Sequence, residues 1–127
     1  MMSFCTAINC MDGRTQEPVI SFLKQRFGTD HVDSITEPGP IRFLANEKEG
    51  PTAASIMQRL EISVKKHGSK AIAVVAHAEC TGNPYPKDFQ LEQLGRAIDC
   101  VKHAYPDLEV IGLWLGLDWT VTEFRIS

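Results

Sequence analysis

Six consecutive apolar residues, Ala71 to Ala76 (AIAVVA), limit the fold of this chain more than any other segment. A strand with one solvated face alternates apolar and polar residues, whereas a strand covered on both faces is apolar throughout. Strands of the second kind belong to parallel sheets, whose neighbouring strands are joined by long crossover connections that are usually helices. The segment therefore predicts an α/β protein with a central parallel strand at residues 71–76.

Strand-like and helix-like segments alternate along the rest of the chain. The other strands are expected at residues 4–10, 31–36, 108–115 and 120–126. Three helices are expected where apolar residues recur three or four positions apart: from a cap at Thr15 to Gly28, from Pro51 to Gly68, and after a loop at residues 77–88. The segment Glu37-Pro-Gly-Pro40 predicts a stiff turn.

The order of the strands decides which loops can meet. Sequential order separates the first strand from the third, whereas the order 2-1-3-4 makes them neighbours at a switch point, where ligands bind. Residues 116–119 are too few for a crossover, so the fifth strand should run antiparallel at the sheet edge. We expect a three-layer α/β fold with this mainly parallel sheet, formed by one domain over residues 1–127.

Charge and composition exclude several classes of protein. A formal net charge of −3 does not fit a nucleic-acid-binding protein, which needs clustered Lys and Arg. No apolar stretch approaches the roughly 20 residues that span a bilayer, so no membrane association is expected. The first residues lack the basic region of a signal peptide, and a cytoplasmic protein is the expectation. Its four cysteines should then be thiols or metal ligands and not disulfides.

Metal-binding side chains gather after the first and third predicted strands. Cys10 ends the first strand, and His77 and Cys80 follow the third. In the order 2-1-3-4 these strand ends are about 5 Å apart, and the His-x-x-Cys spacing lets one turn bring both side chains to the same ion. Two thiolates and an imidazole leave one coordination position free, which is typical of catalytic zinc. The sequence predicts such a site at Cys10, His77 and Cys80.

Asp12 and Arg14 follow Cys10 in a loop that Gly13 makes permissive. A carboxylate beside two thiolates needs a cation, which Arg14 can supply through a bidentate pair. So paired, Asp12 should accept a hydrogen bond from a zinc-bound water; unpaired, it can become a fourth zinc ligand. An ordinary loop salt bridge is the alternative interpretation. Glu79 is expected to be a solvated loop carboxylate and not a proton shuttle.

The two clusters resemble the signature of the β-class carbonic anhydrase family, Cys-x-Asp-x-Arg followed by His-x-x-Cys. Here they read Cys10-Met-Asp12-Gly-Arg14 and His77-Ala-Glu-Cys80. Residues 59–80 are similar to the family's helix and strand that lead into its second ligand pair, and residues 109–124 are similar to its last two strands. The resemblance implies reversible hydration of carbon dioxide to bicarbonate by a zinc-bound hydroxide. It assigns Zn²⁺ to the two cysteines and the histidine, and catalysis to the Asp12–Arg14 dyad. A homodimer is also expected, although the chain starts at its first strand, without the family's N-terminal arm.

Two departures from the family pattern keep other functions open. Thr36-Glu-Pro-Gly-Pro40 replaces the family's Arg-Asn-Ala-Gly stretch, and Thr81 separates the second cysteine from Gly82. The second hypothesis is therefore a zinc-binding relative that hydrolyses a molecule such as carbonyl sulfide, or that binds metal without catalysis. A third hypothesis has Cys10 as a nucleophile and Arg14 holding an oxyanion. It fits less well, because the loops that wrap such anions are longer than the three residues found here.

Overall fold

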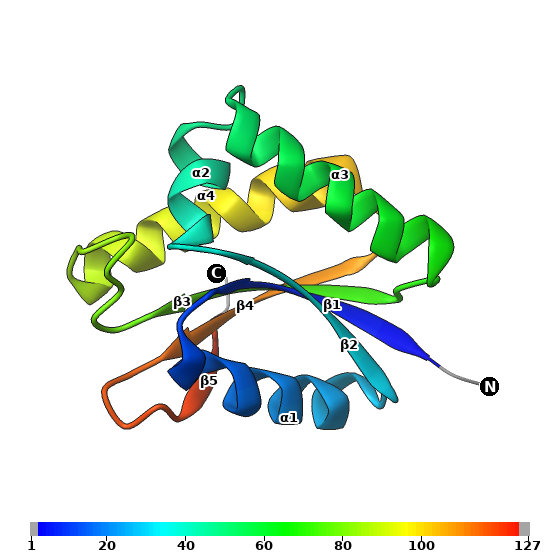
Figure 1. The fold of residues 1–127 in the computed structure, drawn as a ribbon, viewed down its shortest axis with the longest axis horizontal. Helices are drawn as coiled ribbons and strands as arrows, with labels where there is room; N and C mark the ends of the chain where they lie inside the picture. Colours follow the sequence, from blue (N-terminus) through cyan, green and yellow to red (C-terminus); the bar gives the residue numbers. More distant parts are fainter. Residues whose placement is uncertain (1–2, 125–127) are drawn as a thin grey trace.

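The computed structural model describes residues 3–124 and contains a five-stranded sheet between two layers of helices (Figure 1). Its strands are β1 Phe4–Cys10, β2 His31–Glu37, β3 Ala71–His77, β4 Glu109–Leu115 and β5 Val121–Phe124. A 3₁₀ turn, η1 Gly13–Thr15, leads into helix α1 Gln16–Phe27, and the other helices are α2 Pro40–Asn46, α3 Pro51–Lys66 and α4 Lys87–Ala104.

The sheet has the strand order β2-β1-β3-β4-β5. Strands β1 to β4 are parallel, and β5 pairs antiparallel with β4 at the edge. The predicted order and the antiparallel fifth strand are therefore confirmed. The pairing of Ala7 with Ala73 and of Ile8 with Val74 makes β1 and β3 neighbours, so their carboxyl ends lie side by side.

Alternate residues of β3 enter two hydrophobic clusters, one on each face of the sheet. Ile72 and Val74 pack beneath α2, α3 and α4, whereas Ala73 and Val75 pack against α1 on the opposite face (Figure 1). All seven residues of β3 are buried. This double cover explains why the strand carries no polar residue before His77, its last.

Helix α2 is an element that the sequence pattern did not predict. The turn expected at residues 37–40 is shorter, because Glu37 ends β2 and Pro40 already begins α2. Between them, Gly39 has a left-handed backbone conformation with a φ of 69°. Proline suits the first position of a helix, where a backbone N–H would have no partner within the helix. Seven residues are too few to show a clear helical period, so α2 resembled a loop.

Two smaller expectations are also revised. Thr15 precedes α1, but its hydroxyl donates to the Asp12 carbonyl at 2.8 Å and accepts no bond from a helix N–H, so the predicted side-chain cap is wrong. Strand β5 covers Val121–Phe124, and the remaining residues predicted for it, 125 and 126, lie outside the described residues. Within residues 3–124, no helix is long and apolar enough to cross a membrane.

Candidate metal centre

The two predicted clusters meet at the carboxyl ends of β1 and β3. Cys10 is the last residue of β1, His77 is the last residue of β3, and Cys80 lies on the loop that leaves β3. The Sγ atoms of Cys10 and Cys80 are 3.9 Å apart, and the ligand atoms of all three residues lie within 4.8 Å of one another. All three side chains are buried. Among residues 3–124, this is the group of His, Cys and acidic residues whose spacing fits a metal ion.

The imidazole of His77 has one nitrogen with a hydrogen-bond partner and one without. Its Nδ1 lies 2.7 Å from the Ala78 carbonyl oxygen, so Nδ1–H donates there, and in the neutral ring Nε2 carries the lone pair. Nε2 is buried and has no hydrogen-bond partner, and the whole residue is only 1% exposed. Leaving such an atom unpaired costs about 1–3 kcal/mol. An ion bound by Nε2 and two thiolates would remove that cost, so the donor set fits zinc.

The two sulfurs differ in their readiness to ionise. A hydrogen bond from the Cys80 thiol lowers the pKa of Cys10 to about 4 although burial opposes the change, and His77 and the backbone N–H groups of Asp12 and Gly39 lower it further. The pKa of Cys80 is raised because its thiol donates that bond and because it is buried beside the Cys10 thiolate. Burial lowers the pKa of His77, but the Cys10 sulfur and a backbone carbonyl outweigh burial and raise it. Without metal, the cysteine pair therefore shares one negative charge.

Asp12 and Arg14 form a bidentate ion pair beside this cluster. Nε and Nη2 of Arg14 donate to the two carboxylate oxygens of Asp12 at 3.1 and 2.8 Å. The backbone N–H of Arg14 also donates to Asp12 Oδ1, at 2.9 Å. These hydrogen bonds lower the pKa of Asp12 to about 2, so its carboxyl group is ionised at neutral pH. The predicted pairing is present, and the three-residue metal cluster does not include Asp12.

Two residues with left-handed backbone conformations flank Arg14. Its guanidinium carbon lies 4.3 Å from the centroid of the Trp119 ring, which in turn lies 5.7 Å from the His77 ring centroid. Nη1 of Arg14 is 3.4 Å from a carboxylate oxygen of Glu79, whose side chain is 61% exposed. Trp119 and Glu79 have φ values of 61° and 57°, which are uncommon away from glycine and cluster at functional sites. The sequence pattern carried no sign of this role for Trp119.

Three glutamines that the sequence did not single out hold the loops around the cluster. Gln16 donates to two backbone carbonyl oxygens of the β1–η1 loop, at 2.8 and 2.9 Å. Gln90 donates to the carbonyl oxygen of His77 at 3.0 Å, and Gln93 accepts a hydrogen bond from Asn83 at 2.7 Å. Gln90 and Gln93 are each only 1% exposed. Glutamine on a helix is usually expected in solvent. The signal that could have identified Gln90 and Gln93 is their spacing from the inward-facing apolar residues of α4.

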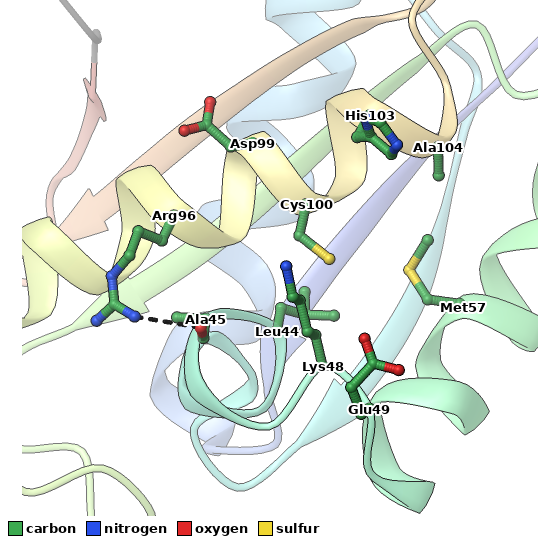
Figure 2. A pocket seen from close by; sticks show the side chains of 10 residues that line it. All are labelled: Leu44, Ala45, Lys48, Glu49, Met57, Arg96, Asp99, Cys100, His103 and Ala104. Carbon is green, nitrogen blue, oxygen red and sulfur yellow. Dashed lines mark hydrogen bonds between the residues drawn. The ribbon is translucent and has the colours of Figure 1, made fainter.

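The remaining histidines and cysteines lie apart from the cluster. His31, His67 and His103 are exposed, and Cys5 is buried against the α1 side of the sheet. Cys100 is partly exposed and lines a cleft of about 680 Å³ between α4 and the α2–α3 segment (Figure 2). The cleft is on the helical layer, and none of its lining residues belongs to the metal cluster.

A smaller cavity, of about 510 Å³, touches the cluster from the outside of the β3–α4 loop. Its lining residues come from one stretch of this loop: Glu79, Cys80, Thr81, Pro84 and Tyr85. Cys80 is the one member of the three-residue cluster that lines this cavity.

Comparison with known proteins places the chain in a family. Residues 1–125 match a model of the family described as "Putative carbonic anhydrase". The chain belongs to this carbonic anhydrase family. An uncharacterised protein of Rickettsia conorii is 27% identical to the chain over 128 residues, which cover 91% of the chain and 69% of that protein. An uncharacterised protein of Rickettsia bellii is 27% identical over 130 residues, which cover 91% of the chain and 78% of that protein.

Solved carbonic anhydrases share the fold. The β-carbonic anhydrase isoform I of Trichomonas vaginalis has a TM-score of 0.61 at 15% identity, covering 94% of this chain and 80% of that one. The carbonic anhydrase of Glaciozyma antarctica has a TM-score of 0.65 at 13% identity, with coverages of 94% and 80%. The tetrameric β-carbonic anhydrases of Sordaria macrospora have a TM-score of 0.61 at 15% identity, covering 98% of this chain and 81% of that one. The expected likeness to β-carbonic anhydrases is thus confirmed at the level of family and fold.

Proposed function

We propose that the chain is a zinc-dependent lyase that interconverts carbon dioxide and bicarbonate, with Cys10, His77 and Cys80 as the zinc ligands. The observation that carries the proposal is the buried Nε2 atom of His77, which has no hydrogen-bond partner. It belongs to a cluster whose ligand atoms lie within 4.8 Å of one another, at the switch point of the sheet. The family and the fold support the same function.

The ligand set favours a catalytic ion over a structural one. Structural zinc sites have four protein ligands, whereas catalytic sites have three and keep the fourth position for a reactant. Zinc bound here would lower the pKa of water to about 7 and so supply a nucleophile at neutral pH. Asp12 is the further candidate for a ligand that the sequence offers, and three N–H groups of Arg14 hold its carboxylate away from that role.

In this proposal Asp12 orients the attacking oxygen and Arg14 positions Asp12. Because the pKa of Asp12 is about 2, its carboxylate is only a hydrogen-bond acceptor at neutral pH. An acceptor at this place fixes the direction of the reactant O–H, which reduces the entropy lost in reaching the transition state. Arg14 is itself held between Asp12 and the ring of Trp119, so the orientation of the carboxylate is defined from both sides.

A second candidate function is hydrolysis of a molecule that resembles carbon dioxide, such as carbonyl sulfide, or metal binding without catalysis. The observation that favours it is the segment Glu37–Pro40, where the resemblance implies pocket-lining polar residues. Here the Glu37 carboxylate is paired with Arg59 of α3, and the following Pro-Gly-Pro carries no polar side chain. The same metal centre would then face a different pocket.

We further propose that the chain assembles, with a homodimer as its smallest unit. The Sordaria macrospora enzymes of the same fold are described as tetrameric. Exposed apolar side chains lie in or beside the loops at the carboxyl end of the sheet: Met11, Tyr85, Phe89 and Leu117. Light scattering of the purified chain tests this, and a monomer at all concentrations would contradict it. A cytoplasmic location stays a prediction of the sequence.

Stopped-flow hydration of carbon dioxide tests the proposed reaction. Zinc-loaded protein should accelerate hydration between about pH 7 and 9, in proportion to its zinc content, and Cys10→Ser should remove both the zinc and the rate. If the native chain holds zinc but does not accelerate hydration, the lyase proposal is wrong. Hydrolysis of carbonyl sulfide by the same preparation then tests the second candidate.

A further inference from the structure

Two glycines from separate loops lie against each other beside the metal cluster. Gly39 is in the turn between β2 and α2, and Gly82 is in the loop between β3 and α4. A Cβ atom on Gly39 would lie 2.8 Å from the Asn83 Cβ and 3.0 Å from the Gly82 carbonyl carbon. A Cβ atom on Gly82 would lie 2.5 Å from the Pro38 carbonyl carbon. Side chains do not approach backbone atoms so closely, so both loops need glycine where they touch.

This close approach ties the two loops to the residues that carry the sulfurs. Cys10 pairs with Glu37, two residues before Gly39, and the backbone N–H of Met11 donates to the Glu37 carbonyl oxygen at 3.0 Å. The backbone N–H of Asn83, next to Gly82, donates to the Cys80 carbonyl oxygen at 3.2 Å. Because each loop is bonded to the backbone at one of the two cysteines, a shift of one loop against the other changes the distance between the two Sγ atoms.

Residues next to both glycines attach the two loops to the helices on one face of the sheet. Asn83, next to Gly82, is fully buried, and its Nδ2 donates to Gln93 of α4 at 2.7 Å. Pro40, next to Gly39, is the first residue of α2. Helices α2 and α4 pack in the same hydrophobic cluster, so neither loop can shift without moving that cluster.

We propose that Gly39 and Gly82 are positioning residues of the metal centre: they let the β2–α2 turn lock onto the β3–α4 loop, and the lock sets the spacing of Cys10 and Cys80. This role presupposes the proposed zinc site but no particular reaction. It also joins the two departures from the family pattern, since Pro38-Gly39-Pro40 and the glycine displaced by Thr81 are the two halves of one contact.

The test compares Gly39→Ala and Gly82→Ala with two matched controls. Gly68 has a φ of 67°, close to the 69° of Gly39, but a Cβ there meets nothing within 4 Å. Gly68→Ala therefore carries the same backbone strain without the clash. Gly95, in α4, also has open space and has no positive φ, so Gly95→Ala adds a methyl group alone and controls for Gly82→Ala.

Two measurements report the lock without reference to activity. Competition with a chromophoric chelator gives the zinc affinity, and the sulfur-to-cobalt charge-transfer absorption of Co²⁺-loaded protein reports whether both sulfurs bind the ion. Both lock variants should lose about 10–100-fold in zinc affinity, the range found when groups behind the ligands are altered. Their charge-transfer intensity should fall, while Gly68→Ala and Gly95→Ala keep native values. Circular dichroism of the metal-free proteins shows which variants fold.

A second variant keeps the test decisive if a lock variant folds poorly. Asn83→Gly removes the nearest atom that a methyl group on Gly39 would meet, together with the hydrogen bond to Gln93, so the reference in this background is Asn83→Gly itself. Adding Gly39→Ala to Asn83→Gly should cost less zinc affinity than adding Gly39→Ala to the native chain. Native affinity in both lock variants, an equal loss in Gly68→Ala, or no relief by Asn83→Gly would each overturn the proposal. A native chain that binds zinc but does not hydrate carbon dioxide would refute only the proposed reaction.

Discussion

The Sγ atoms of Cys10 and Cys80 lie 3.9 Å apart although 70 residues separate them in the chain. The distance follows from the strand order, which makes β1 and β3 neighbours, and from the loop that returns Cys80 to the end of β1. It is far longer than a disulfide bond of about 2.05 Å. It is close to the roughly 3.8 Å that separates two sulfurs bound to one tetrahedral zinc at about 2.3 Å.

Zinc binding should release about two protons per chain at pH 8.5, one from a thiol and one from the zinc-bound water, whose pKa the ion lowers to about 7. The hydrogen bond from Cys80 lowers the pKa of Cys10 to about 4, so Cys10 is already a thiolate there. The same bond raises the pKa of Cys80, which keeps its proton until the metal displaces it. His77, whose pKa is also raised, releases a further fraction of a proton. That fraction decreases as the pH increases, because less of the imidazole is protonated before the metal binds.

Calorimetric titration with zinc in buffers of different ionisation enthalpy counts these protons. Since protons compete with the metal, the affinity should rise with pH. Release of about three protons, or of one or none, would contradict the assigned charge states.

Asp12→Asn should lower the rate of carbon dioxide hydration by about 100-fold and leave the zinc content unchanged. Asparagine keeps the shape of the side chain but removes the charged acceptor that Arg14 holds. Arg14→Lys should give a smaller loss, because an ammonium group keeps the charge but cannot form the two-pronged pair. Elemental analysis of both variants is the control, and loss of zinc from Asp12→Asn would make Asp12 a ligand.

The fold could be predicted because its strongest signal is local. The apolar run at β3, the helical periods on either side and the short β4–β5 connection each limit the topology, and only the order 2-1-3-4 brings Cys10 to His77. Helix α2 was missed because it is shorter than two full helical periods and starts inside a Pro-Gly-Pro segment typical of turns.

The candidate metal ligands could be found in the sequence because few types of side chain bind zinc and these residues follow two predicted strands. The groups that support them could not. Gln90 and Gln93 look like exposed helix positions, and they are buried only because the loop after β3 folds back over α4. Trp119 reaches Arg14 through a left-handed φ that tryptophan rarely adopts. The lock between Gly39 and Gly82 depends on two loop conformations at once.

Trp119→Ala should lower the hydration rate by about 2–5-fold, with little change in zinc affinity. The ring faces the Arg14 guanidinium at 4.3 Å, and a cation–π contact at an exposed site contributes about 0.5–1 kcal/mol. Trp119→Phe should keep part of the rate, because phenylalanine also offers a ring face. Equal rates in Trp119→Ala and the native chain would show that the Trp119 ring does not help to position Arg14.

Gln90→Leu should reduce the free energy of unfolding of the metal-free protein by about 1–3 kcal/mol, because it removes the donor to the buried carbonyl oxygen of His77. Gln90 donates to the carbonyl oxygens of His77 and Tyr85, each at 3.0 Å. Urea unfolding measures the change. Gln25→Leu, on an exposed position of α1, is the matched control and should stay within about 0.5 kcal/mol of the native chain. Equal stability of the two variants would refute the bracing role of Gln90.

X-ray absorption at the zinc edge tests the metal centre most directly, because it counts the atoms bound to the ion. Native protein loaded with zinc should show two sulfur neighbours at about 2.3 Å and two nitrogen or oxygen neighbours at about 2.0–2.1 Å. Cys10→Ser should lose one sulfur neighbour or the ion itself. A spectrum without sulfur, one with four sulfurs, or a native chain that takes up no zinc would contradict a centre formed by Cys10, His77 and Cys80.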